Sequence, residues 1–359
     1  MNAQRYRYED LVDFSARLLE CAGLPVERAR VVGSLFIEAD LLGYSTHGMQ
    51  RLPTNVEWLL KGETRKDGDH RVEASTPACE TWDADFLPGP WITARAVDRA
   101  CDMAAEVGVG TVVVRRAQHV ACLASYLERA TRRRMMVTLT ASTPTEAVVV
   151  PHGGLSRVFS CNPSAAGIPT NADPILIDTT AAMSAQGPLF RARRLGRKLP
   201  LPVIVSQDGR LSDDPSEFVD RGGGILPVGG LEQGHKGFGM ALLTEAVSGA
   251  LGGFGRSGQS GDSEANGVFV QAIDPAHFAG RETFEREMGS LAVQCRASAV
   301  APGHDGVRVP GDRALARKRD QLRDGVELIA PIVDDILPWA GRLGCPFPAP
   351  VEPRHRKPA

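Results

Sequence analysis

The sequence predicts an α/β fold with a helical lobe that both ends of the chain contribute. Residues 8–60 carry apolar side chains at helical spacing, with glycine at the breaks. The middle of the chain mixes short apolar runs of the strand type with alanine-rich helices, and residues 312–343 return to a helical pattern. Because the strands do not alternate regularly with helices, we expect a fold other than the doubly wound Rossmann fold.

The elements follow in order. The repeat of Leu11, Phe14 and Leu18 predicts a helix over 8–23, and Pro25 fits the first turn of the next helix. Further helices are expected over 31–42, 56–60, 93–107, 120–134, 237–251, 281–295, 312–323 and 326–343, and strands over 111–114, 135–140, 148–150, 157–160, 175–177 and 267–273. We therefore divide the chain into a helical lobe (1–75), an α/β domain (76–297), a C-terminal loop and helices that pack back on the lobe (298–345), and an exposed tail (346–359).

Composition limits the classes of partner. The chain of 359 residues has a net charge of −2, so it offers no basic field for nucleic acid or an anionic membrane, and a small molecule is the default partner. No apolar run approaches the roughly 20 residues that span a bilayer, and the N-terminus lacks the apolar core of a secretory signal. The seven cysteines show no zinc-ligand spacing, so we expect free thiols in a reducing cytoplasm and no metal site.

The stretch 38–53 carries the first candidate chemistry. The helical pattern breaks at Gly43, and the hydroxyls of Ser45 and Thr46 precede His47. If a short helix restarts there, Arg51 lies four residues after His47 on the same face. An imidazole beside a guanidinium suits the binding of a carboxylate while a proton moves at the neighbouring carbon. From spacing alone, a cap or packing role for His47 is the more frequent alternative.

Two further side chains follow predicted strands. His119 leaves the end of the strand at 111–114, where it is either a site residue or a surface cap. Asp178 comes directly after the apolar residues 175–177, and a buried carboxylate there would need a partner, for which a histidine is suitable. The alternative for Asp178 is a turn with the adjacent threonines.

A glycine-rich stretch over 226–240 runs into a helix and carries His235 and Lys236 at its entry. Glycines permit close backbone approach to a phosphate, so the stretch is a candidate phosphate cradle, although it could also be only a tight turn. A literal G-x-G-x-x-G at 253–258 follows a helix and not a strand, so we interpret it as a linker.

Five blocks together resemble the malate/L-lactate dehydrogenase family of the non-Rossmann type, which includes sulfolactate, ureidoglycolate and diketogulonate dehydrogenases and cyclic ketimine reductases. The blocks are residues 43–53, 115–119, 159–188, 226–240 and 309–313, in the family's order. The resemblance implies the family's own α/β fold, nucleotide binding by the domain 76–297, a homodimer, and a site shared between the helical lobe and that domain.

The resemblance also implies a small-molecule carboxylate substrate, NAD or NADP as cofactor, and roles for particular residues. His47 would be the acid/base, with His119 as a second donor or the alternative acid/base and Asp178 orienting a histidine. Arg51 and Thr46 would bind the substrate. The residues expected at the cofactor are Asn162, Thr180, His235, Lys236, Gly311 and Arg313.

The chain departs from the family pattern at several polar positions. The residues that differ are Thr46, Arg116, Ala117, Ala181, Ala182, Pro188 and Asp312. These losses support one alternative, a binding or structural homologue without turnover, which the retained histidines, Arg51 and Asp178 oppose. A second alternative, reduction of a cyclic imino acid, stays open because an imine carbon beside a carboxylate needs the same side chains.

Overall fold

A mixed seven-stranded sheet forms the centre of the computed structural model, which describes residues 3–257 and 264–351. The strands run in the order β2-β3-β4-β11-β5-β6-β7, and every neighbouring pair is antiparallel except β3 and β4. Their bounds are β2 (Arg71–Ser75), β3 (Cys79–Asp83), β4 (Val109–Ala117), β5 (Met136–Ser142), β6 (Pro163–Ile168), β7 (Ile175–Thr180) and β11 (Asn266–Ile273). The α/β prediction is confirmed, and the strand order is not that of a Rossmann fold.

Helices cover both faces of this sheet. The helices involved are α4 (Gly89–Val107), η3 (Leu123–Tyr126), α5 (Leu127–Thr131), α9 (His235–Thr244), η4 (Glu245–Ala250) and α10 (Arg281–Arg296). Val268 of β11 points into the main core on the side of α4. The neighbouring Gly267 points to the opposite face, where an added Cβ would lie 2.2 Å from the carbonyl oxygen of Ser248 in η4. Glycine at this position lets η4 pack directly on the sheet.

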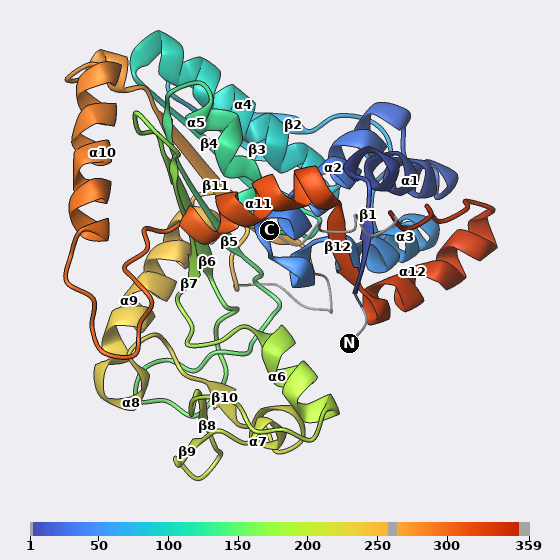
Figure 1. Ribbon diagram of the computed structural model, residues 1–359, viewed down its shortest axis with the longest axis vertical. Coiled ribbons are helices and arrows are strands. Elements are labelled where there is room, and N and C mark those ends of the chain that lie inside the picture. Colours follow the sequence, from blue (N-terminus) through green and yellow to red (C-terminus); the bar gives the residue numbers. More distant parts are fainter. Residues whose placement is uncertain (1–2, 258–263, 352–359) are drawn as a thin grey trace, which may run out of the picture.

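Both ends of the chain build the helical lobe (Figure 1). Its elements are β1 (Ala3–Tyr6), α1 (Tyr8–Cys21), α2 (Val26–Leu42), α3 (Leu52–Lys61), α11 (Asp312–Asp324), β12 (Val326–Ile329) and α12 (Ala330–Leu343). Strand β1 pairs antiparallel with β12, while α11 packs on α2 and α12 packs on α1 and α3. The N- and C-terminal segments therefore share one core.

Helix α11 also fixes the end of α2 that leads to residues 43–51. Gln321 Nε2 donates to the carbonyl oxygens of Asp40 and Leu41, at 2.8 and 3.0 Å, which satisfies acceptors that a helix end leaves unpaired. Lys318 Nζ lies between the carboxylates of Glu38 in α2 and Glu128 in α5. The lobe and the sheet are thus tied together next to the candidate site.

A smaller subdomain lies below the main sheet in Figure 1. It contains α6 (Gln186–Arg194), β8 (Ile204–Val205), β9 (Leu211–Ser212), α7 (Pro215–Val219), β10 (Gly224–Ile225) and α8 (Gly230–Gln233). Its three short strands pair in the order β10-β8-β9, and β8 and β10 contribute to a separate core with Phe159, Leu189 and Phe218. The sequence did not predict this sheet.

Several predicted elements are wrong in detail. The runs at 148–150 and 157–160 form an isolated bridge between Val149 and Phe159, not strands of the main sheet. The helix expected over 326–343 begins with β12. The start of the expected tail is packed, because the Phe347 ring lies 5.3 and 4.8 Å from the rings of Tyr6 and Phe14, centroid to centroid. Residues 352–359 of the tail lie outside the described residues.

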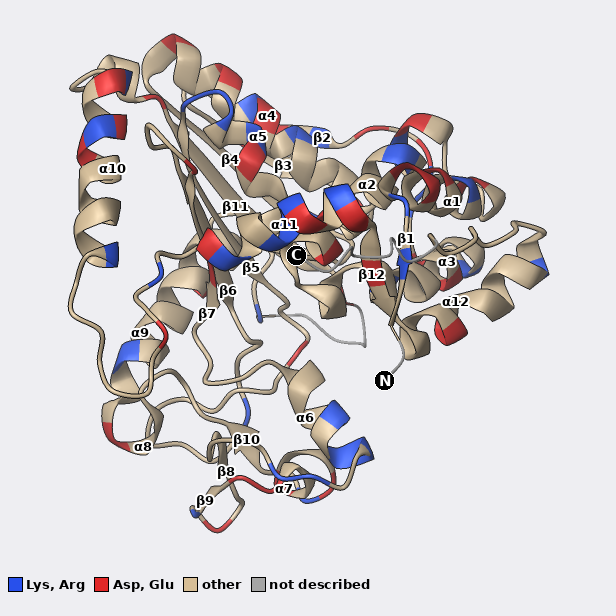
Figure 2. Cartoon of the chain, viewed as in Figure 1, with Lys and Arg blue, Asp and Glu red and all other residues tan. Residues whose placement is uncertain are grey.

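Both basic and acidic side chains lie on α10 and on α11 (Figure 2). Among the helices that the structure describes, none is long and apolar enough to cross a membrane. The described residues also contain no group of three or more side chains that could hold a metal ion.

Candidate active site

The loop that carries His47 is anchored by a buried carboxyl group. Gly43 ends α2 in the left-handed conformation, at φ +96°, and two 3₁₀ turns follow, η1 (Ser45–His47) and η2 (Met49–Arg51). The Met49 amide donates to Asp40 Oδ2 at 2.7 Å. A Cβ on Gly48 would lie 2.4 Å from the same oxygen, so glycine is needed there. Asp40, which the sequence did not single out, therefore anchors the loop that carries His47.

His47 is half-buried and neutral in the resting site. Its Nδ1 lies 2.9 Å from Thr46 Oγ1, so the threonine that departs from the family's serine still orients the imidazole. Burial, and then the positive charge of Arg51, lower the pKa of His47 to about 4. Near pH 7, His47 can accept a proton.

The structure brings His119 to His47, as the site prediction requires. The two rings stack with their centroids 5.9 Å apart and an angle of 21° between their planes. His119 Nδ1 accepts a hydrogen bond from the Ala121 amide at 3.1 Å, which leaves the ring proton on Nε2. Burial, followed by Arg51 and His47, lowers the pKa of His119 well below its ordinary value. The pair therefore consists of two neutral imidazoles.

Asp178 lies near this pair but has a different partner from the one expected. Its Oδ2 accepts from the Ala124 amide at 2.9 Å and from Cys122 Sγ at 3.7 Å. In the described part of the chain, neither His47 nor His119 is among its hydrogen-bond partners. Burial raises the pKa of Asp178 to about 6. No hydrogen bond in the described part of the chain therefore supports a role for Asp178 in orienting a histidine.

Tyr44 lies three residues before His47 and was not singled out from the sequence. Burial, and then the charge of Asp178, raise the pKa of the half-buried Tyr44 hydroxyl to about 12. A phenol held in its protonated form beside a carboxyl group with a raised pKa can donate a hydrogen bond near neutral pH. Tyr44 is therefore a further polar group of the candidate site.

Arg51 meets a carboxylate that sequence reasoning missed. Arg51 Nη2 lies 2.5 Å from Glu264 Oε2, and the Arg51 side chain is 21% exposed. Arg51 Nε is buried and has no hydrogen-bond partner in the parts of the chain that the structure describes. The guanidinium thus has both a bound carboxylate and an unused donor.

Glu146 is a second carboxyl group near Arg51. It accepts a hydrogen bond from Gln186 at the start of α6, and burial raises its pKa, with Glu264 raising it further and Arg51 lowering it. Gly187 lies beside Thr46, since a Cβ there would be 3.6 Å from Thr46 Cγ2. The start of α6 therefore closes the site on the side of Thr46. No local pattern in the sequence marks Glu146 or Glu264.

Glycines of the stretch 226–240 pack closely against its own backbone, as a tight turn requires, and its role as a phosphate cradle stays a prediction. Gly229 adopts φ +100°, and a Cβ on Gly234 would lie 2.2 Å from the carbonyl oxygen of Gly230. His235 and Lys236 are exposed at the first two positions of α9. An exposed cation at the N-terminus of this ten-residue helix is suited to a phosphate group.

The other residues expected at the cofactor differ in exposure and in the hydrogen bonds that they already make. Asn162 is fully buried at φ +49°, with Nδ2 donating to Glu245 at 2.9 Å and Oδ1 without a partner among the described residues. Thr180 Oγ1 donates to the carbonyl oxygen of Ala182 at 2.9 Å, so that hydroxyl closes a local turn. Arg313 is exposed beside Gly311, where a Cβ would lie 2.8 Å from the amide nitrogen of Leu176 in β7.

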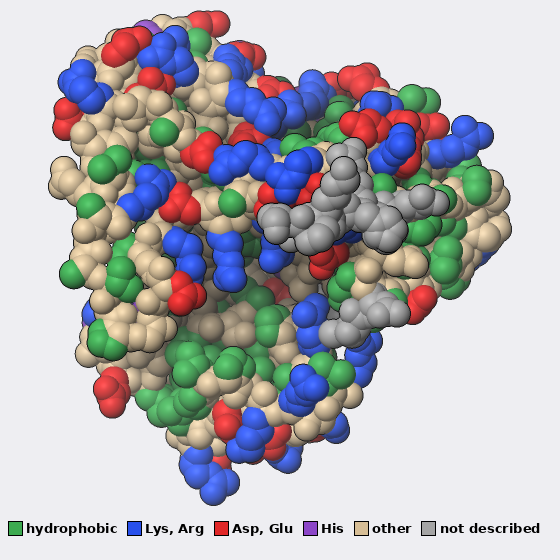
Figure 3. Space-filling view, in the orientation of Figure 1, with side chains coloured by type: hydrophobic (Ala, Val, Ile, Leu, Met, Phe, Trp, Pro, Cys, Tyr) green, Lys and Arg blue, Asp and Glu red, His purple; other side chains and the backbone are tan. Residues whose placement is uncertain are grey.

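The backbone connects these elements. The Val228 amide donates to the carbonyl oxygen of Ala181 at 2.8 Å, and the Ala181 amide donates to that of Asn162 at 3.2 Å. The glycine-rich stretch, β7 and the segment around Asn162 are therefore neighbours. The face in Figure 3 is hollowed between the helical lobe and the small subdomain, with Lys and Arg side chains along the edge of the hollow.

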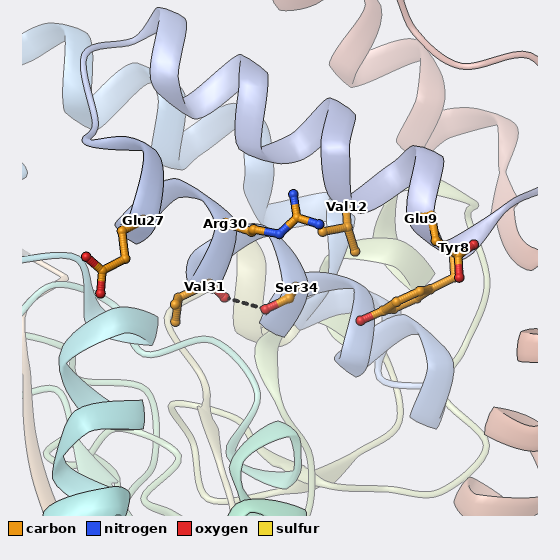
Figure 4. Close-up of a pocket in the computed structure, with 7 residues that line it drawn as sticks. All are labelled: Tyr8, Glu9, Val12, Glu27, Arg30, Val31 and Ser34. Carbon is orange, nitrogen blue, oxygen red and sulfur yellow. Dashed lines mark hydrogen bonds between the residues drawn. The ribbon is translucent and has the colours of Figure 1, made fainter.

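A separate groove of about 330 Å³ lies in the helical lobe (Figure 4). Its lining comes from α1 and α2 and consists of Tyr8, Glu9, Val12, Glu27, Arg30, Val31 and Ser34. None of the predicted site residues lines it. The candidate chemistry therefore lies elsewhere, between the lobe and the sheet.

Known proteins define the class. The model of the malate/L-lactate dehydrogenase family matches residues 6–337, and the chain belongs to this family of oxidoreductases. It is 28% identical over 351 residues to a malate dehydrogenase from Pyrococcus abyssi, covering 96% of each chain. The structure resembles the sulfolactate dehydrogenase from Methanocaldococcus jannaschii, with a TM-score of 0.86 at 28% identity, covering 96% of this chain and 98% of that one.

A second solved relative is named for a different activity. The delta1-piperideine-2-carboxylate reductase from Pseudomonas syringae gives a TM-score of 0.82 at 26% identity, covering 94% of this chain and all (100%) of that one. The prediction of a nicotinamide nucleotide, NAD or NADP, is confirmed by relatives whose names state it. They are a (2R)-3-sulfolactate dehydrogenase (NADP(+)) from Chromohalobacter salexigens, 27% identical with 90% and 94% coverage, and a ureidoglycolate dehydrogenase (NAD(+)) from Escherichia coli K12, 28% identical with 88% coverage of both.

Proposed function

We propose that this chain is an NAD(P)-dependent dehydrogenase that interconverts a small 2-oxo acid and the corresponding 2-hydroxy acid. The observation that carries the proposal is the meeting of His47 and His119 at 5.9 Å, next to the charge of Arg51. A hydroxy acid offers one proton and one carboxylate, and these side chains match both groups.

Arg51 binds the substrate carboxylate in this proposal. Its ion pair with Glu264 supports the role, because the guanidinium already accommodates a carboxylate at 2.5 Å. Its buried Nε, which has no partner among the described residues, could add a second hydrogen bond in a forked arrangement. Thr46, beside Gly187 and His47, lines the same space.

His47 moves the proton at the reacting oxygen. In the tautomer whose Nδ1–H donates to Thr46 Oγ1, Nε2 is free to accept the hydroxyl proton during oxidation. His119 carries its proton on Nε2 and stabilises the oxygen as a hydrogen-bond donor. Asp178 and Tyr44 would supply further polar groups beside the histidines, which differs from the histidine-orienting role expected for Asp178.

When bound, the nicotinamide nucleotide supplies or accepts the hydride. His235 and Lys236 would hold its phosphates, and Arg313 beside Gly311 offers a further exposed cation. The unpartnered Asn162 Oδ1 is a buried acceptor for an amide donor, and Thr180 would contribute once its local turn opens. Titration with NADH and with NADPH would determine which nucleotide the protein prefers.

A cyclic imino acid is the second candidate substrate. The two neutral imidazoles favour it, because a protonated cyclic imine brings its own proton and needs no imidazolium donor. Reduction of a 2-oxo acid must instead draw a proton from the pair or from solvent. The fold relation to a piperideine-carboxylate reductase supports the same candidate.

We also propose a homodimer in a reducing cytoplasm. Large apolar side chains that are 41–65% exposed continue from α9 beyond η4, namely Met240, Leu242, Leu243 and Leu251. An exposed apolar row of this kind is typical of a subunit interface. A Leu243→Glu variant should therefore shift the protein toward monomer in light scattering.

The seven free cysteines support the proposal of a reducing compartment.

The test is binding followed by turnover. NADH and NADPH are titrated against the purified protein by tryptophan fluorescence, and 2-oxo acids and cyclic imino acids are then added separately. Oxidation of one nucleotide by a 2-oxo acid supports the proposal, and oxidation only by an imino acid supports the second candidate. Binding without turnover on either panel would favour the homologue without catalysis.

His47→Ala is the decisive variant, with His304→Ala on an exposed loop as its control. We expect kcat to fall by about 10²–10⁴-fold for His47→Ala, with the nucleotide Kd nearly unchanged. Equal loss of nucleotide binding and turnover would contradict the assigned role. His304→Ala should leave both quantities unchanged.

A further inference from the structure

Two cysteines from opposite ends of the chain meet at the rim of the helical lobe. Cys21 is the last residue of α1 and is exposed, whereas Cys345 follows the end of α12 and is 2% exposed. Their sulfur atoms are 3.3 Å apart. This distance places two thiols in direct contact, and no part of the proposed function uses them.

The backbone on both sides of the contact is held in place. Gly344 ends α12 in the left-handed conformation at φ +67°, and the Cys345 amide then donates to the carbonyl oxygen of Ala340 at 2.9 Å. Beyond Cys345, the ring of Phe347 packs on Tyr6 and Phe14. The buried thiol therefore faces Cys21 because the chain around it is packed.

We propose that Cys21 and Cys345 form a dithiol–disulfide site, which closes when a small-molecule disulfide oxidises the protein. The exposed Cys21 is the entry thiol, and the buried Cys345 resolves the intermediate. Burial, and then the neighbouring Cys21, raise the pKa of Cys345 to about 11, which suits the second role better than the first.

The exchange balances with oxidised glutathione as the oxidant. The Cys21 thiolate attacks one glutathione sulfur, a bond forms between the two sulfurs, and the first glutathione leaves as a thiolate that takes up a proton. Cys345 then loses its proton and attacks the Cys21 sulfur, so the second glutathione leaves in the same way. Two electrons and two protons pass from the protein to the glutathione disulfide.

The new bond would join the end of α1 to the segment after α12. It would close a loop that contains most of the chain, and long loops gain most from a cross-link in the unfolded state. Helices α1 and α12 already pack against each other, and Cys345 Sγ also lies 3.8 Å from the carbonyl oxygen of Arg17 in α1, so the bond requires little rearrangement. We expect the oxidised lobe to unfold at a temperature at least about 3 °C higher than the reduced lobe.

The experiment uses the full chain, treated with either oxidised or reduced glutathione and then digested without reduction. We expect a linked peptide pair containing Cys21 and Cys345, and a loss of two titratable thiols. The Cys345→Ser variant should instead accumulate a glutathione adduct on Cys21. The Cys21→Ser variant should show no cross-link at all.

Cys295→Ser, which removes another exposed thiol, is the matched control and should still form the cross-link. A protein in which Cys21 carries glutathione while Cys345 stays reduced would overturn the proposal. So would identical adducts in the wild type and in Cys345→Ser. Because Cys21 is exposed, Cys21→Ser keeps the test valid even if Cys345→Ser does not fold.

Discussion

Replacing Asp40 by asparagine tests whether a protonated carboxyl group anchors the loop of His47. Asp40 is 4% exposed, accepts from the Met49 amide at 2.7 Å, and has an Oδ1 without a partner in the described residues. Burial raises its pKa to about 8, while the hydrogen bond from Met49 lowers it in part. Asparagine has nearly the same shape as the protonated carboxyl group and can keep the bond from Met49.

The sign of the pH effect follows from this raised pKa. The unfolded chain releases the Asp40 proton near pH 4, whereas the folded protein keeps it until about pH 8. Raising the pH through this window therefore removes stability from the wild type. At about 1.36 kcal/mol per pKa unit, the loss between pH 5 and pH 8 is about 4 kcal/mol. For a chain of this length, that corresponds to about 5 °C in Tm.

The assay is thermal unfolding of the wild type and Asp40→Asn from pH 5 to pH 8.5 in one buffer series. We expect the Tm of Asp40→Asn, relative to the wild type, to rise with pH by about 5 °C. Asp13→Asn removes a carboxylate that is 65% exposed on α1, so it controls for the change in net charge. Parallel pH profiles for the wild type and Asp40→Asn would refute the reasoning.

Two further predictions concern Arg51. Glu264→Gln should lower the KM for an acid substrate about 2–5-fold with little change in kcat, because the carboxylate that competes for Arg51 is removed. Initial rates measure both constants. An unchanged or higher KM would argue against competition. Arg51→Gln should raise the pKa of His47 from about 4 toward its ordinary value and move the acid limb of kcat/KM for oxidation to higher pH. Arg51→Lys keeps the charge and is the matched control. Its acid limb should stay in place, while its KM should rise because the forked hydrogen bonds are lost. A shift of the acid limb equal to that of Arg51→Gln would contradict the assignment.

Periodicity predicted the long helices and the buried strands β4, β5 and β11, because each carries enough apolar residues for a local signal. It missed β2, whose five residues are all exposed, and β6, which is made largely of small residues. The two-residue strands of the small subdomain have no period at all. Their pairing depends on contacts made after the chain has folded, which no local window contains.

The same distinction explains the candidate site. Resemblance in several separate blocks indicated His47, Arg51 and His119, which the fold brings together. Glu146 and Glu264 reach the same region through the packing of loops far apart in the sequence, and neither lies in a chemical motif. Tyr44 lies inside the signature stretch, three residues before His47, but its sequence position alone did not mark it as a polar group of the site. Asp40 lies in the signature stretch, but only its burial shows that its carboxyl group anchors the loop of His47.

The departures from the family pattern acquire a physical meaning in the structure. Arg116, where the family has asparagine, makes two hydrogen bonds of 2.8 Å to Asp83, which is 1% exposed and whose pKa the arginines hold near 2. Ala181 and Ala182 are buried in the core of the small subdomain, where hydroxyl groups would need partners.

The backbone of Ala181 joins the segments on both sides of it. Ala181 accepts from Val228 of the glycine-rich stretch and donates toward Asn162, so the segments that would hold a nucleotide stay connected. Loss of the hydroxyls therefore changes which side chains can contact a cofactor without removing the cradle. A chain degenerating toward a purely structural role would have no reason to keep His235 and Lys236 exposed at the start of α9 and two neutral histidines beside Arg51. That combination favours turnover with an altered nucleotide contact over loss of catalysis.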